Sequence, residues 1–114
     1  MKNLVKLSYT PLAIERMQIE MLKKLYKNEL EFPQRSMDIV KKIMIYDQTE
    51  DYIIRAKTGW ALRVEDQIGW FIGYVEKGYD VYFFATNLQS KKPEEGFKSR
   101  QEITFGILKE LKIL

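Results

Sequence analysis

The 114-residue sequence contains no cysteine and no histidine. Without cysteine, the chain can form neither a disulfide framework nor a thiolate metal site. Without histidine, it lacks the commonest metal ligand and the commonest general base of proteins. The composition therefore excludes a serine–histidine–aspartate triad and a zinc-hydrolase mechanism, and we expect no cofactor.

Long hydrophobic runs are missing as well. No stretch approaches the roughly 20 apolar residues that a transmembrane helix needs, so we expect no membrane partner. Within the first ten residues, Lys6 interrupts the one apolar stretch, so this segment lacks the apolar core of a signal peptide. We expect the polypeptide to stay in the compartment where it is made.

Neither sign of charge dominates the sequence. Nineteen basic and sixteen acidic residues give a net charge of +3, and the charges are interspersed along the chain instead of forming blocks. A basic α+β nucleic-acid binder would need a clustered basic face, so we expect no nucleic-acid partner. With 46% hydrophobic residues, the chain can bury a core, and its length predicts one structural unit spanning residues 1–114.

Two helices are predicted in the first half of the chain. Thr10-Pro11 is a typical helix start, with a threonine N-cap and a proline at the first helical position, and this helix should run to about Asn28. Phe32-Pro33 breaks the chain, after which helical spacing resumes from Gln34 to Met44. The apolar stripe of the first helix predicts a packing face rather than a membrane contact.

The period of the sequence then changes, and β-branched and aromatic residues predict three strands, at Tyr52–Lys57, Gln67–Glu76 and Val81–Leu88. A polar turn, Asp47–Asp51, precedes them. A short link containing glycine joins the last two strands, which predicts an antiparallel hairpin. A closing helix around Phe97–Leu111 should lie on the sheet. The predicted fold class is α+β: two helices, a three-stranded antiparallel sheet and a C-terminal helix.

The most informative motif is Lys57-Thr58-Gly59, which comes at the end of the first predicted strand and is followed by the strand Ile68–Glu76. With Tyr52–Gly59, the preceding helical segments and Arg100 near the start of the last helix, these residues resemble the C-terminal portion of a class D serine β-lactamase, a penicillin-binding transpeptidase-like domain. The resemblance implies a partial β-lactamase fold and, in a completed site, a β-lactam or peptidoglycan-like ligand.

The resemblance also implies roles for five residues. Lys57 would be a cation beside the reacting serine and the substrate carboxylate, and Thr58 would donate its hydroxyl to that carboxylate. Gly59 would leave room for the substrate, and the backbone N–H of Trp60 would be one oxyanion donor. Arg100 would pair with the β-lactam carboxylate. The competing interpretation makes Lys57 and Arg100 surface cations.

For the two tryptophans, the competing interpretation is a place in the core, which we prefer for Trp70.

The nucleophile of the family is not in the sequence. There, a serine in Ser-x-x-Lys forms an acyl-enzyme, helped by a second motif beginning with serine and by a Tyr-Gly-Asn loop. No serine has a lysine three residues later; the serines are Ser8, Ser36, Ser90 and Ser99. Loss of a nucleophile or base typically lowers the rate by several orders of magnitude, so the chain alone should be inactive.

Two hypotheses follow. In the first, the chain is the C-terminal part of a class D β-lactamase-like, penicillin-binding or β-lactam-sensing domain and lacks the N-terminal part that bears the nucleophile. In the second, it is a non-catalytic α+β binding or interaction module. An upstream Ser-x-x-Lys would favour the first.

The residues before Pro11 fit the family poorly, and the family's terminal strands and helical lobe have no counterpart. Such a part should expose a sheet edge and an apolar helical face, which predicts a homo-oligomer or pairing with a complementary segment. The β-lactam preference and the choice between hydrolase, transpeptidase and sensor stay open. The family is typically periplasmic or secreted, whereas no export signal is recognised here.

Overall fold

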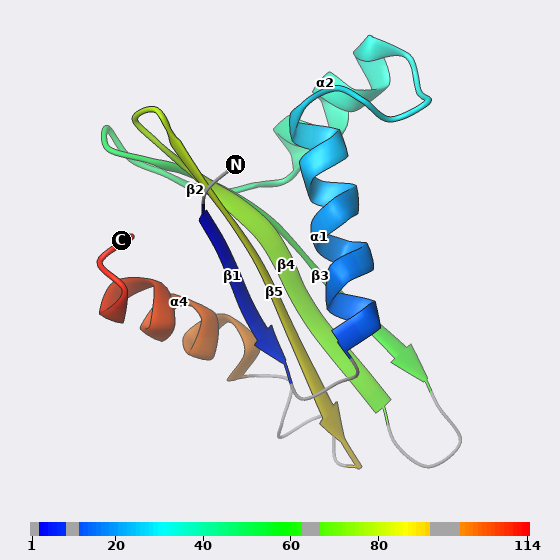
Figure 1. The fold of residues 1–114 in the computed structure, drawn as a ribbon, viewed down its shortest axis with the longest axis vertical. Helices are drawn as coiled ribbons and strands as arrows, with labels where there is room; N and C mark the ends of the chain where they lie inside the picture. Colours follow the sequence, from blue (N-terminus) through cyan, green and yellow to red (C-terminus); the bar gives the residue numbers. More distant parts are fainter. Residues whose placement is uncertain (1–2, 9–11, 63–66, 92–98) are drawn as a thin grey trace.

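The computed structural model describes residues 3–8, 12–62, 67–91 and 99–114, and these form the predicted α+β fold. The elements are β1 (Asn3–Ser8), α1 (Leu12–Tyr26), α2 (Gln34–Ile43), β2 (Ile45–Gln48), β3 (Ile53–Leu62), β4 (Gln67–Lys77), β5 (Asp80–Ser90) and α4 (Arg100–Glu110). The strands form one sheet in the order β1-β5-β4-β3-β2 (Figure 1).

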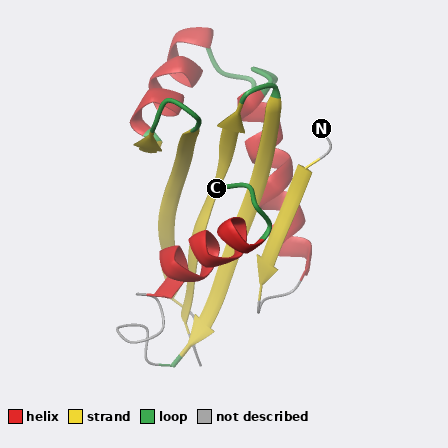
Figure 2. Ribbon diagram, turned by 90° about the vertical axis from the view of Figure 1, so that its left-hand side faces the viewer, coloured by secondary structure: helices red, strands yellow, loops and turns green. Residues whose placement is uncertain are grey.

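Helices cover both faces of this sheet. Helices α1 and α2 lie on one face, and α4 lies on the other, as the two perpendicular views show (Figures 1 and 2). The placement of α4 on the sheet confirms the prediction for the closing helix. A sheet covered on both sides needs apolar side chains on both sides, and the strands supply them.

The two-residue period of β4 divides the core into two clusters. Ile72 and Tyr74 pack toward α1 with Leu22 and Phe83. Phe71 and Val75 point to the opposite face and pack with Phe84 and with Leu108 of α4. Tyr74, Phe71 and Phe83 are fully buried, so both faces of the sheet contribute to folding.

The hairpin predicted between the last two strands is confirmed. Strands β4 and β5 are antiparallel, and the last pair of their register is Lys77↔Asp80. Gly78 and Tyr79 form the connection, and Gly78 has φ +61°, a left-handed conformation that costs glycine little. This hairpin is the centre of the sheet, and β3 is aligned against it.

The sheet has five strands and not the predicted three, because β1 and β2 were missed. β1 pairs in parallel with β5, about 80 residues away in sequence, and a local pattern carries no information about such a partner. β2 has four residues, all exposed; the first two follow the predicted helix, which ends at Met44, and the last two were assigned to the predicted polar turn. Its hydrogen bonds come from β3, with a register shift between Ile45 and Asp47.

Several predicted boundaries also shift. Strand β3 continues to Leu62, so Lys57-Thr58-Gly59 lies inside a strand and not at its end. Helix α1 ends at Tyr26, two residues early, where Asn28 turns the chain with φ 60°. The predicted helix start at Thr10-Pro11 lies outside the described residues. No helix in the described ranges is long and apolar enough to cross a membrane.

Candidate functional site

Four of the five predicted site residues are consecutive in β3. In the antiparallel register with β4, Lys57 lies opposite Ile72, Gly59 opposite Trp70 and Trp60 opposite Gly69. The long pairing with β4 fixes the backbone of this segment, so its groups are held on a rigid element and not on a loop.

Alternation along β3 sends neighbouring side chains to opposite faces of the sheet. Ile54 and Ala56 belong to the core cluster under α4. Lys57 borders the cavity on the α1 and α2 face, and its side chain is exposed. Consecutive residues of β3 therefore place their side chains on both faces of the sheet.

The outer edge of β3 carries the backbone groups that the predicted oxyanion role requires. Strand β2 pairs with β3 from Ile53 to Arg55, and the Ala56 N–H then donates to the Met44 carbonyl at 2.8 Å. N–H groups of alternate residues in a strand point to the same edge. The N–H of Trp60, four residues after Ala56, therefore points to this outer edge, beyond the end of β2.

Arg100 is the first residue of α4, and the structure brings it to β3. Its Nη1 donates to the Gly59 carbonyl at 2.8 Å and lies 3.4 Å from the Trp70 carbonyl. Partial burial lowers the pKa of the Arg100 guanidinium from its usual value. Arginine keeps its charge in proteins even so. The structure thus places a cation from a distant part of the sequence against the Lys57-Thr58-Gly59 triplet.

A tryptophan takes the space beside Gly59. A Cβ added at Gly59 would lie 2.1 to 2.2 Å from three atoms of the Trp70 indole. The absence of a side chain at position 59 is therefore required by Trp70, in addition to any substrate. Trp70 is half-buried and packs against the core cluster under α1, which agrees in part with the core interpretation.

The Trp60 side chain does not lie in the core. It is 49% exposed, and its indole N–H donates to the side chain of Gln67. The core interpretation of Trp60 is therefore wrong, and the residue presents its backbone to the outer edge and its ring to the surface. Gln67 begins β4, so this contact joins the ends of the two strands on which the site residues lie.

A cavity of about 280 Å³ opens where β2 leaves β3. Both Lys57 and Thr58 line it, with Gln101 of α4 and Tyr46 of β2. Gly59, Trp60 and Arg100 are not among its lining residues, although Arg100 precedes Gln101 in the same helix. The structure thus brings Lys57 and Thr58 to the wall of one cavity and places Arg100 against the backbone carbonyl of Gly59, the next residue in the strand.

A second cavity, of about 610 Å³, lies between the helices α1 and α2 and the sheet, and sequence reasoning missed it. Lys57, Trp70 and Ile72 border it from the strands. The other lining residues are Ser36 and nine apolar residues: Met21, Leu22, Leu25, Leu30, Phe32, Met37, Val40, Ile43 and Met44. The apolar residues of the second predicted helix were the available signal, because they exceed what one packing face needs.

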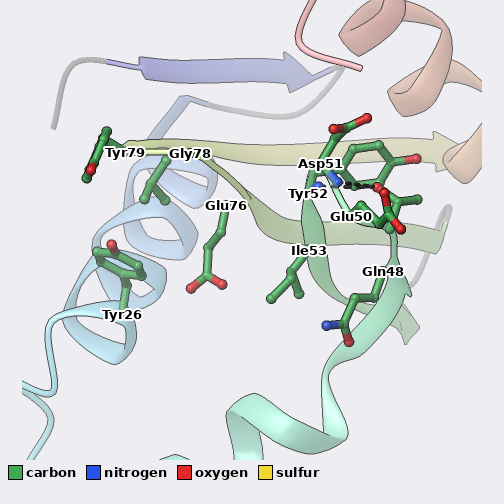
Figure 3. Close-up of a pocket in the computed structure, with 11 residues that line it drawn as sticks. Tyr26, Gln48, Glu50, Asp51, Tyr52, Ile53, Glu76, Gly78 and Tyr79 are labelled. Atoms are coloured by element: carbon green, nitrogen blue, oxygen red, sulfur yellow. Dashed lines mark hydrogen bonds between the residues drawn. The ribbon is translucent and has the colours of Figure 1, made fainter.

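Figure 3 shows a third cavity, of about 560 Å³, at the end of the sheet where the β4–β5 connection lies. Thr49 closes the adjacent turn, since its Oγ1 accepts from the backbone N–H of Asp51 at 3.1 Å. Glu50, Asp51 and Glu76 line the cavity beside three tyrosines. No group of three potential metal ligands occurs among the described residues, and none of the predicted site residues lies here.

Comparison with known proteins agrees with this geometry. Residues 3–109 match the family described as penicillin binding protein transpeptidase domain. The chain is 46% identical over 97 residues to β-lactamase OXA-48 of Klebsiella pneumoniae, an alignment that covers 85% of this chain and 36% of that relative. The chain therefore spans just over a third of the length of this relative.

Solved structures show the same family relationship. The class D β-lactamase YbXI from Nostoc has a TM-score of 0.79 and 46% identity, covering 88% of this chain and 41% of that one. The C-terminal domain of the Bacillus licheniformis BlaR penicillin receptor has a TM-score of 0.72 and 36% identity, covering 85% and 39%. The predicted resemblance to class D β-lactamases is confirmed, and the chain belongs to the penicillin-binding protein transpeptidase domain family.

Proposed function

We propose that this chain forms one wall of a β-lactam-binding acyl-transfer site of the class D type. Lys57 supplies a positive charge, and Thr58 donates its hydroxyl to the substrate carboxylate. The backbone of Gly59 lies along the substrate, and the N–H of Trp60 is one oxyanion donor. Arg100 is the cation for the β-lactam carboxylate.

The observation that carries the proposal is the hydrogen bond from Arg100 Nη1 to the Gly59 carbonyl, 2.8 Å long, between residues 41 positions apart. The family resemblance assigned these two residues to one site from sequence alone. In this contact the Arg100 side chain is partly buried rather than fully solvated. The contact therefore supports the site interpretation over that of a solvated surface charge.

The outer edge of β3 supports the rest of the assignment. Lys57 and Thr58 line the same cavity of about 280 Å³, and the Trp60 N–H points to the same edge. A ligand carbonyl placed along this edge would meet a backbone donor and a hydroxyl without any movement of the strand. Such preorganised donors are what stabilises the charge that develops in acyl transfer.

The wall lacks a nucleophile, and we propose that a segment carrying Ser-x-x-Lys completes it. None of the four serines in the sequence is followed by the required lysine. The residues 1–114 are proposed to fold as one unit, since both core clusters rest on the same sheet. The resemblance to the BlaR penicillin receptor makes a β-lactam sensor the second candidate, and a non-catalytic binding module is the third.

The test is intact mass after incubation with benzylpenicillin, beside hydrolysis of a chromogenic cephalosporin. The chain alone should show an unchanged mass and no turnover. Mixed with the purified N-terminal portion of a class D relative that carries Ser-x-x-Lys, it should restore an acyl adduct on that portion. A matched mixture with Arg100→Ala should form less adduct, and a serine-to-alanine change in the added portion should form none.

A penicilloyl adduct on the chain alone would contradict the proposal, because one of its own serines or lysines would then be the nucleophile. Restored hydrolysis would favour the hydrolase, whereas a stable adduct without turnover would favour the sensor. No adduct in any mixture, with both parts folded, would leave the binding module as the better interpretation.

Self-association is a separate part of the proposal. Exposed apolar side chains are concentrated on α1 and α2, where Met17 and Ile43 are each 73% exposed and Met21 is 46% exposed. Such a surface favours a partner, either a second copy or a complementary segment. Light scattering that showed only monomer at high micromolar concentration would count against the homo-oligomer.

A further inference from the structure

The carbonyl that Arg100 contacts and the proposed oxyanion donor belong to one peptide unit. Gly59 supplies the carbonyl, and Trp60 supplies the N–H bonded to the same carbonyl carbon. In a trans peptide these two groups lie on opposite sides of the C–N bond. The carbonyl therefore points toward β4, where Trp70 is the partner of Gly59, and the N–H points to the outer edge of β3. Arg100 thus contacts one end of the unit whose other end is the proposed oxyanion donor.

The contact at the carbonyl end is of a kind that polarises a peptide. Nη1 of Arg100 lies 2.8 Å from the Gly59 oxygen, a distance typical of a hydrogen bond with a charged donor. Partial burial of Arg100 lowers the local dielectric constant and strengthens this bond. The amide is a resonance system, so a cation at its oxygen draws electrons from the nitrogen and makes the N–H hydrogen more positive. The Trp60 N–H should therefore be a stronger donor than an ordinary backbone amide.

The start of α4 is held in place by contacts that do not use the Arg100 side chain. Thr104 Oγ1 donates to the Arg100 carbonyl at 2.8 Å and lies 2.6 Å from the hydroxyl of Thr86 in β5. Both threonines are buried. The carbonyl of residue 100 is retained in every substitution, so a variant at this position removes the guanidinium without removing the bond that fixes the helix start.

We propose a second role for Arg100: it polarises the Gly59–Trp60 peptide and so strengthens the Trp60 N–H as an oxyanion donor. This inference rests on the proposed acyl-transfer function and deepens it. In addition to pairing with the substrate carboxylate, Arg100 acts through the peptide on the carbonyl that reacts. Arg100 should therefore matter even for a β-lactam that has no ionised carboxylate.

NMR of the chain alone tests the polarisation. Accepting a hydrogen bond moves the carbonyl ¹³C and the following amide ¹⁵N downfield, so Arg100→Ala should move the Gly59 ¹³C and Trp60 ¹⁵N signals upfield together. The carbonyl ¹³C of Trp70 should move in the same direction by less, because its oxygen lies 3.4 Å from Nη1. Arg100→Lys, which keeps a cation, should restore part of the Gly59 and Trp60 shifts.

The matched control is Lys109→Ala, which removes a positive charge from an exposed position in the last turn of the same helix. It should leave the Gly59 and Trp60 signals unchanged. Circular dichroism should show the parent fold in all three variants. A general loosening of the strands in Arg100→Ala would instead shift peptides along β3 and β4 without regard to their distance from Nη1.

An acylation assay separates the two roles of Arg100. In the mixture with the N-terminal portion of a class D relative, benzylpenicillin reports on both roles, whereas its methyl ester lacks the ionised carboxylate and reports on polarisation alone. Arg100→Ala should slow acylation by the ester about two- to sevenfold, since one oxyanion donor contributes roughly 10²- to 10³-fold and polarisation strengthens a hydrogen bond by about 10 to 30%. The loss with benzylpenicillin should be larger, and Arg100→Lys should recover part of the ester rate.

Unchanged Gly59 and Trp60 signals in Arg100→Ala would overturn the proposal, and so would equal rates of ester acylation in the parent and Arg100→Ala mixtures. An upfield shift graded by distance from Nη1, together with a slower ester reaction, would support it. If no mixture forms an adduct with either compound, the proposed function fails and the second role of Arg100 fails with it. Acylation of the parent mixture by benzylpenicillin, with spectra that do not respond to Arg100→Ala, would overturn this inference alone.

Discussion

Both faces of the sheet are apolar, but they are covered to different degrees. Under α4, the ring of Phe71 lies 5.4 Å from that of Phe84 and 5.6 Å from that of Phe105, measured between centroids. Under α1 and α2, a similar group of rings, Tyr26, Tyr74 and Phe83, fills one part of the face. The cavity of about 610 Å³ lies beside it.

The helices explain this difference. Helix α4 packs across the central strands β4 and β5 and buries Thr104 and Leu108. Helix α2 buries Met37 among its described residues, while the side chains of Ile39 and Ile43 are exposed. The α4 face is thus complete within this chain. The other face has apolar surface in excess of what the chain itself covers.

Polar contacts follow the same division. Under α4, the hydroxyls of Thr86 and Thr104 lie 2.6 Å apart, and Thr104 also donates to the Arg100 carbonyl at 2.8 Å. This chain of hydrogen bonds ties the start of α4 to β5, and the separate hydrogen bond from Arg100 to the Gly59 carbonyl joins it to β3. We infer that the closed face positions Arg100 beside β3, whereas the open face has room for a ligand or partner.

The largest expected effect comes from Phe71→Ala on the closed face. Removing a fully buried ring should lower the free energy of unfolding by about 3 to 5 kcal/mol. Met37→Ala on the open face should lower it by about 2 kcal/mol, because this side chain borders empty space and loses fewer contacts. Urea denaturation of both variants measures the difference. Equal losses would show that the cavity is closed in solution.

The next effect concerns two glycines. Gly59→Ala places a methyl group against the Trp70 indole, which must move, and should cost about 1 to 3 kcal/mol. Gly106→Ala in α4 meets no atom within 4 Å and should stabilise the protein by about 0.5 to 1 kcal/mol. Thermal unfolding gives both values. If Gly59→Ala were neutral, the contact between Gly59 and Trp70 could not be what requires glycine there.

Much of the closed face and of the arrangement around Lys57-Thr58-Gly59 could be predicted from sequence. Runs of β-branched and aromatic residues at Gln67–Glu76 and Val81–Leu88 and the short glycine-containing link identified the central hairpin. These runs are nearly continuous because each strand is buried on both faces over several residues. The family resemblance placed Arg100 beside the Lys57-Thr58-Gly59 triplet, a contact that local periodicity cannot give. The roles of these residues in catalysis stay predictions.

The open face and the sheet edges could not be predicted in the same way. β1 depends on a partner far away in sequence, and β2 has no buried residue to mark it. Met17 belongs to the apolar stripe of the first predicted helix and Ile43 to the apolar positions of the second, yet both are exposed. Periodicity identifies which side chains prefer burial, but it does not tell whether the chain itself supplies the covering surface.

The smallest expected effect at neutral pH is that of Tyr74→Phe, at the packed end of the open face. Tyr74 is fully buried, and its hydroxyl has no hydrogen-bond partner among the described residues. Removing this hydroxyl should change the free energy of unfolding by less than about 1 kcal/mol at pH 7, in the stabilising direction, because an unpaired polar group leaves the core. Tyr79→Phe removes a fully exposed hydroxyl and is the matched control.

At high pH, the Tyr74 hydroxyl should have a measurable effect on the free energy of unfolding. Burial raises the pKa of Tyr74 from 10.0 to about 12, against a smaller lowering by Arg55. Between these values the unfolded chain has released the proton and the native protein has kept it, so native stability falls as pH rises from 10 to 12. Tyr74→Phe should make this fall shallower, whereas Tyr79→Phe should keep the parent slope. Identical slopes in all three proteins would mean that water reaches Tyr74 and that the packed end of this face is open too.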